Sequence, residues 1–210
     1  MLYNSPEIVS PETYRLIQKL QQIPELKKFY LVGGTALALQ IGHRSSIDID
    51  LFTEEYFHPN DIIPIVISHI GFHVDFQKEN TLLGYIDHVK TDFIRHGYPL
   101  IAPTITEDGI EMVSKQDITA MKINALINSG KRLKDFADIY FLLEEFSVEE
   151  MLGFYMAKYP HMNPMMALRA LSYFDDLDLE IDPPIFVKPL FPDEIISRIK
   201  HAVLHTSHKY

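Results

Sequence analysis

The sequence has no cysteine among its 210 residues. This absence excludes disulfides and cysteine nucleophiles and is typical of a reducing compartment. No apolar run approaches the roughly 20 residues that a membrane-spanning helix needs. The N-terminal residues 1–14 also lack the basic segment and apolar core of a signal peptide. We therefore expect a cytoplasmic protein that makes no contact with membrane.

Positive charge is also scarce. The chain carries 19 Lys and Arg against 29 Asp and Glu, which gives a formal net charge of −10. Proteins that hold long nucleic acids over their whole surface are normally basic. Any contact with nucleic acid is therefore expected to be local and assisted by metal, whereas a nucleoside triphosphate needs no basic surface. With 47% hydrophobic and 23% charged residues, the composition is that of an ordinary globular chain.

The most informative segment is Phe29–Phe52, whose pattern predicts a strand, a Gly-Gly turn, a helix, a loop and a second strand. The second strand, predicted over Ile47–Phe52, carries Asp48 and Asp50. Alternate residues of a strand share a face, so both carboxylates are expected on one side and the apolar residues on the other. Two like charges so placed repel unless a cation lies between them, and Mg²⁺ is the natural ion for carboxylate oxygens.

The paired glycines Gly33 and Gly34 lie upstream of these acids. Glycine lets a backbone approach a phosphate closely, and the start of a helix favours an anion through its free N–H groups and its dipole. The sequence thus predicts a metal site and a phosphate-binding turn within about 25 residues of each other. The alternative is a solvated edge strand with alternating acids after an ordinary tight turn.

Phosphoryl transfer at two metal ions usually needs a third carboxylate. The candidates on neighbouring strands are Asp75, Asp87 and Asp92. Asp92 lies in the best strand context and is our preferred third acid. Asp87 lies in a predicted hairpin turn and is expected to be a turn residue. Asp75 stays open as the alternative to Asp92.

The periodicity of the chain predicts two parts. Residues 1–110 alternate between short strands and helices, and from Ser114 the apolar residues recur at helical spacing. Pro99 and Pro103 are expected only to break the chain between the two parts. We predict an α+β protein with an α/β domain over residues 1–110 and a helical domain over residues 111–210. A cleft between two such domains is a common place for a ligand.

A basic cluster in the second part also stands out in an acidic chain. It comprises Lys122, Lys131, Arg132 and Lys134, and it is followed by Asp135 and Asp138. Taken alone, this composition favours a solvated helix face with ion pairs such as Lys134–Asp138, which stabilise a helix only slightly.

These motifs resemble those of known families. Val32-Gly33-Gly34, a spacer, and Asp48-Ile49-Asp50-Leu51 resemble the signature of the polymerase-β-type nucleotidyltransferases. Lys122 with the run Lys131–Leu142 resembles the second conserved block of the AbiEii/AbiGii toxins, which are nucleotidyltransferases of type IV toxin–antitoxin systems. Residues 80–93 and 170–176 are similar to the same family, so the resemblance extends from about residue 29 to about residue 202.

The resemblance implies a nucleotidyltransferase fold, a small mixed sheet flanked by helices, and a role for each matching residue. Asp48, Asp50 and Asp92 would be the catalytic acids that bind Mg²⁺, with Mn²⁺ as the alternative ion. The triphosphate would be held by Gly33, Gly34 and Thr35, the last standing where many relatives have serine. Lys122 would contact phosphate, and Asp135, supported by Asp138, would be the candidate base or substrate aligner. Arg44 and Ser46 could reach phosphates from their loop, the alternative being an ordinary solvated loop.

The implied activity is transfer of a nucleoside monophosphate from an NTP to a hydroxyl group. Family resemblance suggests RNA, such as the 3′ end of a tRNA, as acceptor and a separate antitoxin protein as partner. A protein or small-molecule acceptor is the alternative within the enzyme class. A catalytically inactive nucleotide-binding regulator on the same scaffold is the alternative outside it, and the presence of the full set of acids argues against that alternative.

Overall fold

The computed structural model describes residues 2–210. The chain forms two compact units. The first contains the residues up to Pro99 together with Pro103–Ser114, and the second contains Leu100–Ala102 together with Lys115–Tyr210. The chain therefore enters the second unit briefly at residues 100–102 and returns to the first. It enters the second unit finally at Lys115.

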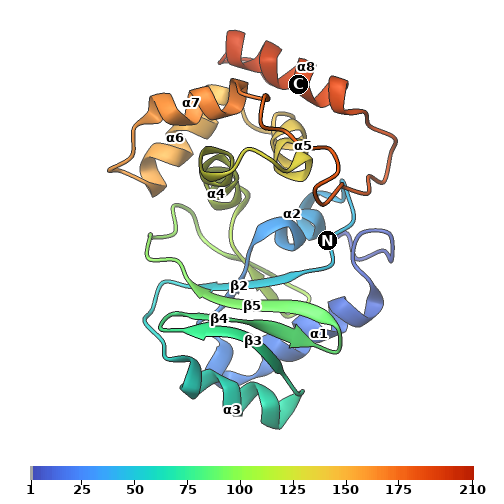
Figure 1. Cartoon of the computed structure of the whole chain (residues 1–210), viewed down its shortest axis with the longest axis vertical. Coiled ribbons are helices and arrows are strands. Elements are labelled where there is room, and N and C mark those ends of the chain that lie inside the picture. The colour runs from blue at the N-terminus through green and yellow to red at the C-terminus, as the bar shows by residue number, and fades with distance from the viewer. Residues whose placement is uncertain (1) are drawn as a thin grey trace. The chain divides into compact units, whose positions relative to one another are not determined.

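The first unit is built on a seven-stranded mixed sheet. Its strands are β1 (Tyr30–Leu31), β2 (Ile49–Thr53), β3 (His73–Lys78), β4 (Thr81–Ile86), β5 (Val89–Arg95), β6 (Ile105–Glu107) and β7 (Ile110–Met112). They lie in the order β3-β4-β5-β2-β1-β7-β6, and Figure 1 shows β2, β5, β4 and β3 in succession. The pairs β2–β5 and β1–β7 are parallel and the other pairs are antiparallel.

Three α-helices belong to this unit: α1 (Pro11–Gln22), α2 (Gly33–Ile41) and α3 (Pro59–His69). Helix α1 begins after Ser10, because the Ser10 hydroxyl accepts a hydrogen bond from the Thr13 N–H at 3.1 Å and proline occupies the first turn. It ends before Pro24, which opens a short 3₁₀ turn (Pro24–Leu26). Helix α2 packs beside β2 (Figure 1).

The hairpin of β6 and β7 is absent from the sequence prediction, which expected only a chain break in this region. Asp108 and Gly109 form its turn with φ of 53° and 76°. An Asp-Gly pair between short strands is a strong hairpin signal, because both residues tolerate positive φ. β7 then joins the sheet through the parallel pairing of Leu31 with Met112.

The second unit is helical, as predicted. Its helices are α4 (Lys115–Asn128), α5 (Leu133–Leu142), α6 (Val148–Lys158), α7 (Pro164–Ser172) and α8 (Pro192–Leu204). Helix α4 packs against α5, α6 and α7, and α8 packs against α5 and α7. The mixed sheet with helices and the helical region confirm the predicted α+β class. Within residues 2–210, every helix is too short or too polar to cross a lipid bilayer.

A buried ion pair links two helices of this unit. Lys158 Nζ in α6 lies 2.7 Å from Asp117 Oδ1 in α4, and both side chains are almost wholly inaccessible to solvent. Asp117 also accepts hydrogen bonds from the backbone N–H groups of Ile101 at 3.1 Å and Ala102 at 3.2 Å. These bonds attach residues 100–102 to α4 and explain why that short segment belongs to the second unit.

Candidate functional site

The Gly-Gly turn lies directly beside the strand that carries the acids. β1 pairs antiparallel with β2, and the Val32 N–H donates to the Asp50 carbonyl oxygen at 2.9 Å. Gly33, the first residue of α2, has φ of 70°, and a Cβ at this position would lie only 2.5 Å from Asp50 Oδ2. Both the left-handed backbone and the neighbouring carboxylate therefore require glycine here.

The second glycine makes room for an arginine. A Cβ at Gly34 would lie 2.5 Å from Nη2 of Arg44. The Arg44 side chain is only 3% exposed, and its Nη1 donates to the Ser45 carbonyl oxygen at 3.0 Å. The alternative of a solvated loop is thus wrong for Arg44. A buried guanidinium at the first turn of α2 adds positive charge where the helix dipole already favours an anion.

Thr35 fastens the loop that leads into the acids. Its hydroxyl is buried, lies 2.8 Å from the Ser46 hydroxyl, and donates to the Asp48 carbonyl oxygen. These contacts fix the backbone at Asp48 relative to the start of α2. The structure thereby gives Thr35 and Ser46 a positioning function, while their predicted contact with phosphate stays a prediction.

Asp50 and Asp92 face each other across two adjacent parallel strands. They are direct register partners in the β2–β5 pair, so their side chains project from the same face of the sheet. Asp92 is 5% exposed, whereas Asp48 and Asp50 are each partly exposed. Strand β2 begins at Ile49 and not at Ile47 as predicted. Asp48 is therefore the residue just before the strand, and the Ile47 side chain is exposed to solvent.

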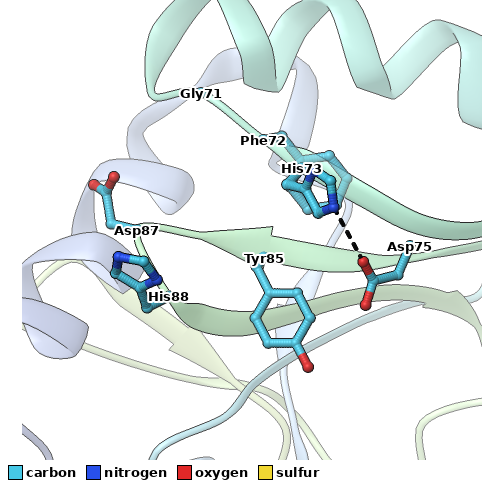
Figure 2. A pocket seen from close by; sticks show the side chains of 7 residues that line it. All are labelled: Gly71, Phe72, His73, Asp75, Tyr85, Asp87 and His88. Carbon is cyan, nitrogen blue, oxygen red and sulfur yellow. Dashed lines mark ion pairs between the residues drawn. The ribbon is translucent and has the colours of Figure 1, made fainter.

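Asp75, the alternative third acid, lies elsewhere in the same sheet. It belongs to the edge strand β3, which β4 and β5 separate from β2. Asp75 Oδ1 lies 3.4 Å from His73 Nε2, and Figure 2 shows both side chains at an open pocket of about 770 Å³. This pocket is also lined by Asp87, the predicted turn residue, whose φ is 45°. The geometry thus favours Asp92 as the neighbour of Asp48 and Asp50.

Lys90 is the cation that the structure places among the acids. Its Nζ lies 2.9 Å from Asp92 Oδ2. Partial burial acts to lower the pKa of the Lys90 ammonium, but the hydrogen bond to Asp92 and the charges of Asp92, Asp50 and Asp48 together outweigh burial. The pKa of Lys90 is therefore raised. The charges of all three predicted metal ligands thus favour the charged form of one ammonium group.

The donor atoms suit a hard divalent cation. Among residues 2–210, Asp92 Oδ1 is one of few buried side-chain atoms without a hydrogen-bond partner. A buried carboxylate oxygen in this state is costly unless a cation binds it. In the same part of the chain, no three Asp, Glu or His side chains are yet close enough to hold one ion together. The residues therefore fit a metal by their chemistry, and the carboxylates must close in to bind it.

The predicted residues of the second unit form a buried network. Lys122 Nζ lies 2.8 Å from Asp135 Oδ1 and 2.7 Å from Asp138 Oδ2, and Arg132 Nη2 lies 2.7 Å from Asp135 Oδ2. Asp135 and Asp138 are buried, so the interpretation as a solvated helix face is wrong for them. The expected Lys134–Asp138 pair is wrong too, because Lys134 pairs with Asp182 instead.

Sequence reasoning missed two features of the site, Lys90 and the burial of Arg44. Lys90 stands two residues before Asp92, so strand alternation alone would have placed both on one face. Nothing in the sequence indicates that Arg44 is buried, because that depends on the tertiary contact with Gly34.

Comparisons with known proteins bear on the family and the fold of this chain. The family model described as "Nucleotidyl transferase AbiEii toxin, Type IV TA system" matches residues 15–82. The uncharacterized protein aq_aa25 of Aquifex aeolicus is 31% identical over 176 residues, which are 81% of this chain and 85% of that protein. A candidate nucleotidyltransferase from H. pylori has a similar fold, with a TM-score of 0.59 and 16% identity over 93% of this chain and 92% of its own. JHP933 from Helicobacter pylori is also similar, with a TM-score of 0.56 and 15% identity over 93% of this chain and 89% of its own.

Proposed function

This chain belongs to the AbiEii family of nucleotidyltransferases, and we propose that Asp48, Asp50 and Asp92 form its catalytic metal site. One observation carries the proposal. Asp50 and Asp92 are register partners on adjacent parallel strands, and Asp50 also lies directly beside the Gly-Gly start of α2. This supports a cation at the carboxylates close to a phosphate at the N–H groups that begin the helix.

The proposed reaction moves a nucleoside monophosphate from an NTP to an acceptor hydroxyl. The hydroxyl oxygen bonds to the α-phosphorus, the bond between the α- and β-phosphates breaks, and pyrophosphate leaves. Mg²⁺, or Mn²⁺ in its place, would polarise the α-phosphate and offset the charge of the leaving group when bound. Gly33 and Gly34 would bind the triphosphate through their backbone N–H groups, and the buried Arg44 guanidinium adds a fixed positive charge there.

The candidate residues of the second unit are Lys122 and Asp135. We propose that Lys122 contacts phosphate and that Asp135 aligns the acceptor or accepts its proton. Arg132 and Lys122 contact the two carboxylate oxygens of Asp135, and this network supports alignment more than proton acceptance, because nearby cations make a carboxylate a weaker base. Asp138, buried beneath Lys122, would support that geometry.

We propose RNA, such as the 3′ end of a tRNA, as the acceptor, and a separate antitoxin protein as partner. The family description as a toxin of a type IV system supports the antitoxin, and the RNA acceptor rests on the resemblance of the sequence motifs. The net charge of −10 favours a local contact with RNA at the active site over wide backbone contacts. The alternative acceptor is a protein or a small molecule.

The test is a transfer assay with purified protein, Mg²⁺, total tRNA and each of the four α-labelled NTPs. Asp50→Asn serves as the control, because it removes one negative charge with almost no change in shape. We expect label in tRNA with the wild type. We expect at least about a 10³-fold loss with Asp50→Asn, since the metal site supplies most of the charge stabilisation in such reactions.

Three other outcomes would change the proposal. Label in protein, dependent on Asp50, would keep the enzyme and replace the acceptor. Transfer by Asp50→Asn at the wild-type rate would overturn the metal site. Absence of label in any acceptor, together with calorimetric binding of NTP, would favour the nucleotide-binding regulator.

A further inference from the structure

Lys90 contacts Asp92, the third of the proposed metal ligands. Its Nζ forms a 2.9 Å ion pair with Asp92 Oδ2, and the carboxylates of Asp50 and Asp48 also act on its charge. Two residues of β5, Lys90 and Asp92, share the sheet face onto which Asp50 projects. The ammonium group therefore neutralises part of an acidic cluster that would otherwise be strongly self-repelling.

The two partners of this ion pair differ in exposure. The Asp92 side chain is 7% exposed, whereas that of Lys90 is 44% exposed. The carboxylate is thus fixed by burial on a sheet strand, while the lysine reaches it from solvent on a flexible stem. Such a lysine can leave its partner without any change of backbone, and its departure would return one oxygen of Asp92 to the site.

Asp92 Oδ1 is buried and has no hydrogen-bond partner among the described residues. Lys90 thus satisfies only one of the two carboxylate oxygens. One ammonium group cannot bind all three carboxylates at once. In agreement, no three Asp, Glu or His side chains within residues 2–210 are close enough together to hold one ion. A doubly charged ion has the charge that the lysine lacks, and it can take several oxygen ligands at once.

We propose that Lys90 is the resident counter-ion of the acid site and is displaced from Asp92 when a divalent cation binds. The proposal rests on the proposed function, since it takes Asp48, Asp50 and Asp92 as metal ligands. Lys90 then has two effects. It stabilises the metal-free protein, and it weakens metal binding by competing for Asp92. The displaced ammonium remains near the site and is available to the incoming triphosphate.

The test is Mn²⁺ binding measured by electron paramagnetic resonance, with thermal unfolding in parallel. The variants are Lys90→Met, which keeps length and removes charge, and Lys90→Arg, which keeps charge. Lys28→Met is the matched control, because Lys28 pairs with Glu55 elsewhere in the same unit. We expect Lys90→Met to bind Mn²⁺ about three- to tenfold more tightly than wild type, as one competing charge is lost from a partly exposed site.

Lys90→Arg is expected to bind Mn²⁺ within about twofold of wild type, and Lys28→Met likewise. In chelator, Lys90→Met should unfold at a lower temperature than wild type, and saturating Mn²⁺ should remove that difference. If wild type binds Mn²⁺ tightly and Lys90→Met binds it equally or more weakly, the proposed competition by Lys90 is overturned while the metal site stands. Failure of every protein to bind Mn²⁺ would overturn the metal site and the competition together.

Discussion

At the scale of single residues, the site depends on close contacts that only glycine permits. Gly33 and Gly34 both lack space for a Cβ, the first because of Asp50 and the second because of Arg44. The sequence motif predicted that these glycines let a phosphate approach. In the structure, the two glycines also let the Asp50 carboxylate and the Arg44 guanidinium approach the start of α2.

A comparison of Gly33→Ala with Gly109→Ala separates the effect of backbone strain from the effect of the contact with Asp50. Both glycines have similar positive φ, 70° and 76°, but nothing lies within 4 Å of a Cβ at Gly109. Each variant should lose about 1–2 kcal/mol of unfolding free energy from left-handed backbone. Only Gly33→Ala should also displace the Asp50 carboxylate and lose transfer activity.

Denaturant unfolding and the label-transfer assay, applied to both variants, measure these two effects. Full activity in Gly33→Ala would show that the position of Asp50 beside the turn does not matter. Loss of activity in Gly109→Ala would show that the comparison reports general destabilisation.

At the scale of elements, the sequence was informative where local patterns decide structure. It predicted the β4–β5 hairpin and the helical second half, because turn residues and apolar spacing act locally. It missed the β6–β7 hairpin despite the Asp108-Gly109 signal. It also assigned Lys134 to Asp138, since helical spacing cannot reveal that Asp138 points inward to Lys122.

The Asp117–Lys158 pair is a buried ion pair between α4 and α6. Lys158→Met would leave the buried Asp117 carboxylate without its cation and should cost about 3–5 kcal/mol of unfolding free energy. Lys115→Met is the matched control, because Lys115, on α4 like Asp117, pairs with Glu145 at a partly exposed site, and it should cost less than about 1 kcal/mol.

Equilibrium unfolding in urea measures the loss of unfolding free energy in each variant. Similar losses in both variants would contradict a special contribution of the buried pair. A large loss confined to Lys158→Met would confirm that α4 and α6 are held together through this charge.

At the scale of the whole molecule, the division of the chain was only partly readable from sequence. The pattern indicated a change from α/β to helical structure, and the structure shows two compact units. The assignment of residues 100–102 to the second unit depends on backbone hydrogen bonds to Asp117, which no periodicity can reveal. Likewise, which acid joins Asp48 and Asp50 depends on strand order, and strand order is a tertiary property.

The central claim is that Asp92, on the strand next to β2, completes the metal site. The most direct measurement compares Asp92→Asn with Asp75→Asn in the label-transfer assay, at equal folded concentration. Asp75 lies on the edge strand beside His73, so it is a matched acid outside the proposed site. We predict that Asp92→Asn abolishes transfer while Asp75→Asn retains it within about threefold, as for surface substitutions away from a site. Loss of transfer in Asp75→Asn with activity retained in Asp92→Asn would contradict it.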